Sequence, residues 1–273
     1  KNKSIFKSNM HISRNMGKKI NIGQKFWKRA NKVIPGGTML FSKNPNLFLP
    51  EFWPSYFKKT KGINILALDN KTYKDFALMG VGTNILGYSN NQVDREVQKI
   101  VRNGNMSSFN SVEEIFLAEK LIDMHKWSDM ARFTRTGGEA ASVAIRLSRA
   151  ATKKEKVAIC GYHGWHDWYL STNLTNSNNL NKHLMTNTPI SGVQKKLKRS
   201  AFAFDYNNFE QLNKISSENN LAAIIMEVSR NTKPKKNFLK KIRDLATKKN
   251  IVLIFDECTS GFRETYGGLH LKF

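Results

Sequence analysis

The sequence contains little cysteine and no long apolar run. Its 273 residues include only two cysteines, Cys160 and Cys258, and each follows a short apolar stretch. Two such cysteines predict reduced side chains in a cytoplasmic protein and exclude a disulfide framework. The chain has no run of roughly 18 apolar residues and no apolar core near its N-terminus, so neither a membrane span nor a secretion signal is predicted.

Acidic residues are also scarce relative to basic ones. The chain has 45 Lys and Arg against 21 Asp and Glu, a formal net charge of +24. This excess raises the hypothesis of a non-catalytic module that binds nucleic acid. The basic residues are scattered, however, and short clusters such as 195–199 lack interleaved aromatic side chains on which bases could stack. Nucleic-acid binding is therefore kept only as an alternative of another class.

Turn signals divide the first third of the chain. Residues 1–20 are polar and basic and predict an N-terminal arm. Residues 21–84 predict a segment with a short amphipathic helix that ends at Pro35-Gly36-Gly37, a loop, and a hairpin. In that hairpin, residues 63–68 and 72–78 flank a turn.

Residues 85–273 predict the major domain. They begin with two helices, the second of which opens at Ser111 with Glu114 in capping-box position. Strands and helices then alternate: strands are expected at 130–133, 157–160, 201–204, 221–228 and 251–255, and helices at 139–151, 209–216 and 238–249. Five strands with crossover helices predict an α/β fold with a mostly parallel central sheet covered by helices.

The most informative stretch ends the last expected strand. Residues 251–255 are all apolar and run directly into Asp256 and Glu257. A strand buried on both faces delivers such a carboxylate to the carboxyl edge of the sheet, where ligands of open α/β sheets bind. Because the acid is partly desolvated there, it needs a cationic or N–H partner, and the ring N–H of a bound cofactor fits. A simple cap of the following turn explains Asp256 equally well.

A glycine pair stands at the start of the first crossover helix. Thr136-Gly137-Gly138 links a strand end to a helix start. Free N–H groups and the helix dipole favour an anion such as phosphate at this place. A tight turn, with Glu139 neutralising the dipole, is the alternative.

Aromatic and acidic side chains follow the next strands. Tyr162 lies between glycines and could lie flat on a planar cofactor. His163 and His166 would suit a metal only if further ligands converged, and no metal site is predicted. Glu227 closes the apolar part of the strand expected at 221–228 and either joins the same site or lies on the surface.

Taken in order, these motifs resemble those of class III, fold type I pyridoxal-phosphate aminotransferases, closest to the glutamate-1-semialdehyde aminomutase group. The resemblance runs from about residue 29 to residue 268 and is carried by 33–37, 86–88, 133–140, 145–149, 162–164, 204–207, 225–227, 255–257 and 261–263. It implies pyridoxal 5'-phosphate (PLP) as cofactor, a small-molecule amino donor and carbonyl acceptor, and a homodimer.

The resemblance also implies residue roles. Gly137 and Gly138 bind the cofactor phosphate, with Thr136 beside them, while Tyr162 and Cys258 lie on opposite faces of the pyridine ring. Asp256 keeps the ring nitrogen protonated, which makes the ring an electron sink. The implied cofactor-binding residues are Thr136, Gly137, Gly138, Tyr162, His163, Glu227, Asp256 and Cys258.

Three departures from the family qualify this expectation. Thr136-Gly137-Gly138 replaces Ser-Gly-Thr and removes a hydroxyl that could bind phosphate. Lys43 stands where aminomutases have an arginine that clamps the substrate carboxylate, which favours an aminotransferase, with the aminomutase as the alternative. The Schiff-base lysine of the family is expected C-terminal to Phe273, so we expect a fragment with a truncated major domain that is inactive alone.

Overall fold

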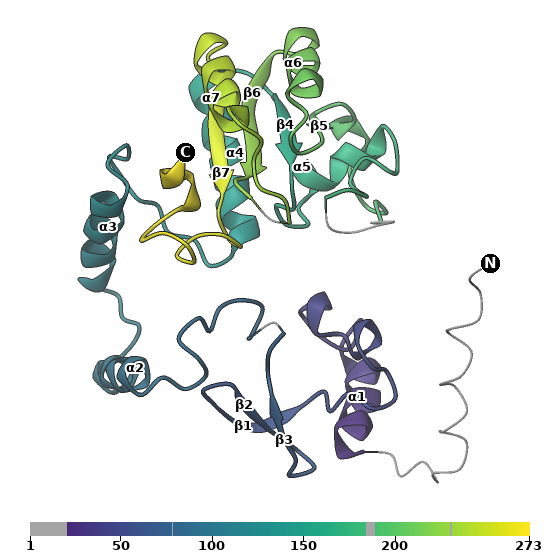
Figure 1. Ribbon diagram of the computed structural model, residues 1–273, viewed down its shortest axis with the longest axis vertical. Helices are drawn as coiled ribbons and strands as arrows, with labels where there is room; N and C mark the ends of the chain where they lie inside the picture. Colours follow the sequence, from purple (N-terminus) through teal and green to yellow (C-terminus); the bar gives the residue numbers. More distant parts are fainter. Residues whose placement is uncertain (1–20, 78, 184–188, 230) are drawn as a thin grey trace, which may run out of the picture. The chain divides into compact units, whose positions relative to one another are not determined.

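The computed structural model describes residues 21–77, 79–183, 189–229 and 231–273 (Figure 1). The arm expected at residues 1–20 and the last position of the expected hairpin therefore lie outside the described residues. Contacts divide the chain into two compact units, Lys1–Ser108 and Phe109–Phe273, and each is described by itself.

The first unit opens with the expected amphipathic helix, α1 (Ile22–Val33). The Asn21 side chain accepts a hydrogen bond from Gly23 N at 2.8 Å and caps the helix start. The helix ends before Ile34, as the Pro-Gly-Gly signal predicts.

A three-stranded antiparallel sheet follows, in the order β1-β2-β3. Its strands are β1 (Phe57–Lys61), β2 (Asn64–Ala67) and β3 (Thr72–Lys74). The predicted hairpin is confirmed as β2 and β3, with Ile65 opposite Tyr73. β1 was missed because its sequence, Phe-Lys-Lys-Thr-Lys, is nearly all polar, as suits an exposed edge strand.

The helix α2 (Asn91–Asn103) falls in this first unit of contacts, and the expected major domain at residues 85–273 stays a prediction. Hydrogen bonds connect the start of α2 to the small sheet. Gly62 and Tyr88 form a backbone bridge, and Lys61 Nζ donates to the Ser89 carbonyl at 2.6 Å. These bonds hold the start of α2 against the small sheet.

The second unit is built on a four-stranded parallel sheet in the order β5-β4-β6-β7. Its strands are β4 (Lys156–Cys160), β5 (Ala201–Ala203), β6 (Leu221–Glu227) and β7 (Val252–Asp256). The α/β fold with a parallel sheet is confirmed.

The fifth strand, expected at 130–133, is wrong for the part of the chain that the structure describes. Residues 130–133 form no ladder with another described segment, and Met130 is 86% exposed. An apolar run becomes a strand only when a neighbouring backbone accepts and donates its hydrogen bonds.

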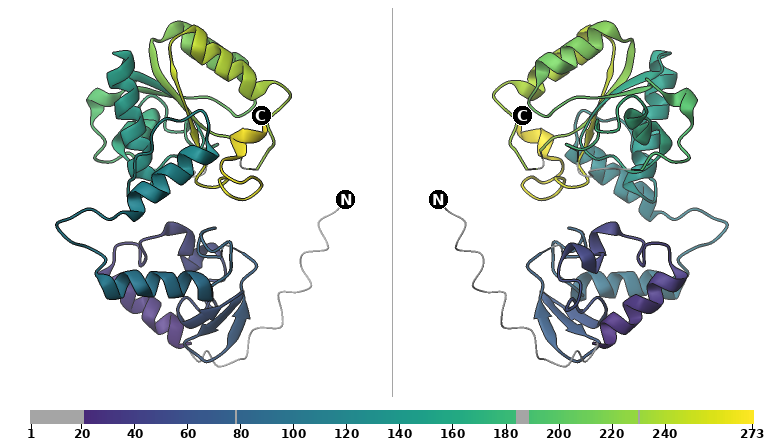
Figure 2. Two further views of the ribbon diagram at one scale, coloured as in Figure 1. Left: turned by 90° about the vertical axis from the view of Figure 1, so that its left-hand side faces the viewer. Right: turned by 90° about the vertical axis from the view of Figure 1, so that its right-hand side faces the viewer.

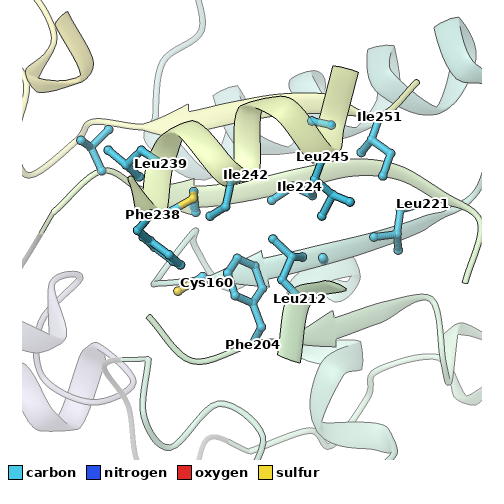
Figure 3. Packing of buried hydrophobic residues seen from close by; sticks show 14 of the residues in the cluster. Cys160, Phe204, Leu212, Leu221, Ile224, Phe238, Leu239, Ile242, Leu245 and Ile251 are labelled. Atoms are coloured by element: carbon cyan, nitrogen blue, oxygen red, sulfur yellow. The ribbon is translucent and has the colours of Figure 1, made fainter. Parts of the chain in front are cut away.

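Helices cover both faces of this sheet (Figure 2). α4 (Gly137–Thr152) and α5 (Asp167–Leu170) pack on one face, and α6 (Phe209–Glu218) and α7 (Phe238–Lys248) on the other. Alternate strand residues separate the two cores: Ile159 packs with the α4 side, whereas Cys160 packs with the α6 and α7 side. Figure 3 shows Phe238 and Ile242 of α7 in the core between the sheet and helices α6 and α7.

Helix α3 (Glu113–Met124) does not have the expected capping box. Val112 occupies the N-cap position without a side-chain bond, and the Ser111 hydroxyl donates to the Glu113 carboxylate instead. The helix is confirmed and its predicted cap is wrong, because Ser111 lies one residue too early.

Short 3-10 helices occupy several connections. They are η1 (Phe41–Lys43), η2 (Pro45–Leu47), η3 (Ser171–Leu174), η4 (Lys195–Leu197) and η5 (Leu269–Lys272). Helix α5, η3 and η4 lie between β4 and β5. Across the described ranges, no helix combines the length and apolar character needed to cross a bilayer.

Strand order places a switch point between β4 and β6. From β4 the chain moves to β5 on one side, and it then returns through α6 to β6 on the other side of β4. Loops that leave β4 and β6 therefore diverge at the carboxyl edge, where open α/β sheets bind ligands.

The core makes a first prediction. Leu212 of α6 is fully buried, whereas Leu147 of α4 is 60% exposed. We expect Leu212→Ala to lower the free energy of unfolding by about 2–5 kcal/mol, because it leaves a cavity. Leu147→Ala, the matched control, is expected to change it by at most about 0.5 kcal/mol. Urea unfolding followed by circular dichroism measures both, and equal losses would contradict the described core.

Candidate functional site

Two acidic side chains end neighbouring strands of the parallel sheet. Glu227 is the last residue of β6 and Asp256 is the last residue of β7, and the two are paired in the sheet register. Glu227 is buried, so its alternative placement on the surface is wrong. The site is built around this pair of carboxylates.

Asp256 has the N–H partner that its position demands. His163 Nδ1 lies 2.8 Å from Asp256 Oδ2, and the side chains are 0% and 12% exposed. Cys258 N donates to Asp256 Oδ1 at 3.0 Å. Burial by itself raises the pKa of Asp256, but the hydrogen bond and charge of His163, together with Cys258 N–H, bring the pKa below its ordinary value. Asp256 is therefore ionised at neutral pH, and it caps the following turn as well.

The start of α4 lies against the end of β7. A Cβ atom added to Gly137 would be 2.8 Å from Cys258 Sγ, so a larger residue there would displace the cysteine side chain. The Thr136 hydroxyl accepts a hydrogen bond from Glu139 N at 3.2 Å and caps the helix. Glu139 in turn accepts from Arg135 N at 2.9 Å. The predicted glycine turn and the predicted acid at the strand end are thus brought together.

Gly161 joins β4 to Glu227 by a close approach. Its φ is +120°, and a Cβ there would lie 2.6 Å from Glu227 Oε2. Both of its backbone groups are fixed: Gly161 N donates to His183 Nδ1 at 3.0 Å, and Tyr169 Oη donates to Gly161 O at 2.9 Å. The strand end therefore has one defined conformation.

Glu227 accepts hydrogen bonds from two further segments. Tyr162 N donates to Glu227 Oε2 at 3.4 Å, and Thr259 Oγ1 donates to Glu227 Oε1 at 3.3 Å. Tyr162 is half-buried, and its ring meets Tyr169 edge-on with centroids 5.9 Å apart. Glu227 thus ties the loop after β4 to the loop after β7.

The two cysteines are free thiols whose surroundings disfavour the thiolate form. Both are free, with Cys160 buried and Cys258 exposed as a residue. Burial raises the pKa of Cys160 to about 12 and that of Cys258 to about 11. Since the thiolate is the nucleophile, neither is suited to attack a substrate at neutral pH.

Glu257 fastens the last described segment to the end of β7. Its carboxylate accepts hydrogen bonds from Leu269 N at 2.6 Å, His270 N at 2.9 Å and the Ser260 hydroxyl at 2.8 Å. Burial alone raises the pKa of Glu257, but these bonds lower the pKa below its ordinary value. The loop after Asp256 is therefore held at both of its ends.

Sequence reasoning placed Lys43 at the site, and that placement stays a prediction. Lys43 ends η1 in the first unit and is exposed. Three other residues that contact the site were not assigned to it: Thr259, His183 and His166. The first follows Asp256 by three residues, which is a signal that the sequence offered. Within the ranges that the structure covers, no three His, Cys, Asp or Glu side chains are grouped as metal ligands.

Comparison with known proteins identifies the family. The sequence profile described as aminotransferase class-III matches residues 51–269. The chain belongs to the class-III aminotransferase family. It is 31% identical over 259 residues to 3-aminobutyryl-CoA aminotransferase of Cloacimonas acidaminovorans, covering 90% of this chain and 57% of the relative. It is 33% identical over 250 residues to glutamate-1-semialdehyde 2,1-aminomutase of Methanobrevibacter smithii, covering 89% and 56%.

Solved structures agree on the fold. An omega-transaminase from Sphaerobacter thermophilus matches with a TM-score of 0.79 and 24% identity, over 92% of this chain and 58% of that one. A glutamate-1-semialdehyde aminomutase from Pseudomonas aeruginosa matches with a TM-score of 0.68 and 18% identity, over 87% and 52%. Fold type I is thereby confirmed for this class-III aminotransferase chain, which spans about half the length of the curated relatives it matches.

The close approach of Gly161 to Glu227 predicts that a side chain at position 161 lowers the free energy of unfolding. Gly161→Ala adds both an unfavourable φ and a clash with Glu227, whereas Gly192→Ala, at φ +87°, meets nothing within 4 Å. We expect the control to lose about 1 kcal/mol of unfolding free energy and Gly161→Ala to lose at least about 3 kcal/mol. Denaturant unfolding measures both, and equal losses would refute the close approach.

Glu257 predicts a pH dependence of stability. Its pKa in the folded protein lies below the ordinary 4.5, so its stabilisation is present above about pH 4.5 and is lost as the pH falls through the folded-state value. Glu257→Gln is expected to cost about 1–3 kcal/mol at pH 7 and much less at pH 3. Glu264→Gln, an exposed control, is expected to have little effect at either pH. Urea titrations at the two pH values test this, and a loss at pH 3 as large as at pH 7 would contradict it.

Proposed function

We propose that the protein is a PLP-dependent aminotransferase that moves an amino group from a small-molecule donor to a carbonyl acceptor. One observation carries this proposal: a largely buried, ionised carboxylate, Asp256, ends β7 at the carboxyl edge of the sheet, and Cys258, two residues later, lies against the N-terminus of α4. The hydrogen bond from His163 to Asp256 and the close approach of Gly137 to Cys258 Sγ define this arrangement.

The residues present fit the cofactor. The backbone N–H groups of Gly137 and Gly138 lie in the first turn of α4, where N–H groups have no partner within the helix and where the dipole favours a phosphate. The carboxylate of Asp256, ionised because its pKa is lowered, is suited to hold a protonated pyridine nitrogen. Tyr162 and Cys258 are proposed to contact the two faces of the ring.

PLP, when bound, supplies an electron sink for the charge that develops at the substrate carbon as its proton is lost. The protein's part is to keep the ring nitrogen protonated and the ring in place. Asp256 does the first, because its charge acts in a partly desolvated site. His163 fixes the carboxylate by its bond to Oδ2, and Cys258 N fixes it by its bond to Oδ1.

A glutamate-1-semialdehyde aminomutase is the second candidate. Its support is the similarity to several aminomutases at up to 33% identity. The argument against it is Lys43, a point charge that lacks the bidentate fork of arginine for a substrate carboxylate. Assaying the complete gene product with the semialdehyde, and separately with keto acids plus an amino donor, distinguishes the two. Activity only on the semialdehyde would overturn the aminotransferase proposal.

Assembly and location belong to this proposal as well. We propose a homodimer in the cytoplasm, and sedimentation of the complete protein as a monomer would count against it. The binding module suggested by the charge of +24 is tested by DNA retention at rising salt. Salt-sensitive retention without any uptake of PLP would favour that module over the enzyme.

Asp256→Asn tests the role of the carboxylate in the complete protein. We expect turnover to fall by at least about 100-fold, because the neutral amide does not hold the ring nitrogen protonated. The far-ultraviolet circular dichroism should stay unchanged. Asp244→Asn is the matched control, since Asp244 is an exposed acid paired with Lys240 on α7. Wild-type turnover in Asp256→Asn would contradict the proposed role.

A further inference from the structure

The imidazole of His166 lies against the start of α4. Residue 138, the second of this helix, is a glycine and contributes no side chain. A Cβ atom at Gly138 would lie 2.8 Å from His166 Cε1 and 3.0 Å from His166 Nδ1. The histidine ring, which comes from the loop after β4, therefore occupies the space that a side chain at position 138 would fill.

One ring nitrogen, Nδ1, has no hydrogen-bond partner among the described residues. His166 Nδ1 is buried and makes no hydrogen bond to any residue that the structure describes. Buried polar atoms are nearly always paired, and an unpaired one is destabilising. The rest of the residue is well fixed: Trp165 stacks on its ring at 5.0 Å between centroids, and its carbonyl accepts from Tyr169 N at 2.9 Å. The unpaired Nδ1 therefore has a fixed position, and a ligand that accepted its hydrogen bond would remove the cost of leaving it unpaired.

That nitrogen lies near the first N–H groups of α4. The point where a Cβ of Gly164 would stand lies 3.0 Å from Gly138 Cα, 3.5 Å from His166 Nδ1 and 3.9 Å from Gly138 N. Gly164 leaves this point without a side chain, at a φ of +98°. A side-chain nitrogen and a backbone N–H group of the first turn of α4 therefore lie close together, at the end of the helix that favours an anion.

We propose that His166 is a phosphate-binding residue of the cofactor site. With its proton on Nδ1, the imidazole donates a hydrogen bond to the phosphate that also accepts from Gly137 N and Gly138 N. This inference rests on the proposed function and extends it. It assigns to a residue of the β4 loop the side-chain donor that position 138 does not supply, and it gives the buried Nδ1 its partner.

Calorimetric titration of the complete protein with two ligands tests the assignment. Pyridoxamine 5'-phosphate carries the phosphate and pyridoxamine does not, and neither has an aldehyde that could react with the many lysines. For His166→Ala we expect the dissociation constant of pyridoxamine 5'-phosphate to rise about 10- to 100-fold, as for the loss of a hydrogen bond to a charged group. The affinity for pyridoxamine should not change.

Two further variants sharpen the test. His166→Asn keeps a side-chain N–H group at a similar distance from the backbone, so we expect it to restore most of the affinity for pyridoxamine 5'-phosphate. His125→Ala is the matched control, because His125 stacks on His270 at 5.6 Å between centroids and its Nδ1 donates to the Leu121 carbonyl at 2.8 Å rather than lying against α4. Circular dichroism checks that each variant is folded.

Each remaining outcome decides against the assignment. Equal weakening of both ligands by His166→Ala would show that the ring acts by packing alone, and an unchanged affinity for pyridoxamine 5'-phosphate would show that it does not contact the phosphate. Either result leaves the proposed function standing. If the wild-type protein bound no pyridoxamine 5'-phosphate, both the proposed function and this inference would be contradicted.

Discussion

A largely buried carboxylate at the end of a strand requires a hydrogen-bond partner, and His163 is that partner for Asp256. The strand that delivers Asp256 and the loop that delivers His163 lie far apart in sequence, so this bond fastens β7 to the segment after β4. It also keeps the acid ionised in a place where burial opposes its charge. The rest of the proposed site depends on that negative charge.

Close backbone contacts then bring the other groups to the same edge. Gly137 lets Cys258 Sγ approach α4, and Gly161 lets Glu227 approach β4, each closer than a Cβ would allow without a shift. In both cases the missing side chain on one segment leaves space for a side chain of the candidate site on another. The candidate site therefore depends both on glycines, which leave space for close approach, and on the carboxylates of the acidic residues.

Much of the second unit was predictable because its two central strands, β4 and β6, are buried on both faces. Apolar runs such as residues 221–227 have few alternatives to a parallel strand, and the helices between them have clear periodicity. The two wrong strand predictions concern segments whose structure depends on pairing with a neighbouring strand. Residues 130–133 have the composition of a strand but no partner among the described residues, and β1 is a strand with almost no apolar residues because pairing alone holds it.

The sequence by itself determined which chemical groups end the strands and begin α4, because hydrophobic periodicity and glycine positions are properties of consecutive residues. The order of these groups along the chain was specific enough to indicate the family. Only the tertiary structure decided which of those groups meet. It paired Asp256 with His163, buried Glu227 beside Gly161, and brought His166 to Gly138. These contacts join residues tens of positions apart, and no local pattern encodes a distance between side chains that only packing brings together.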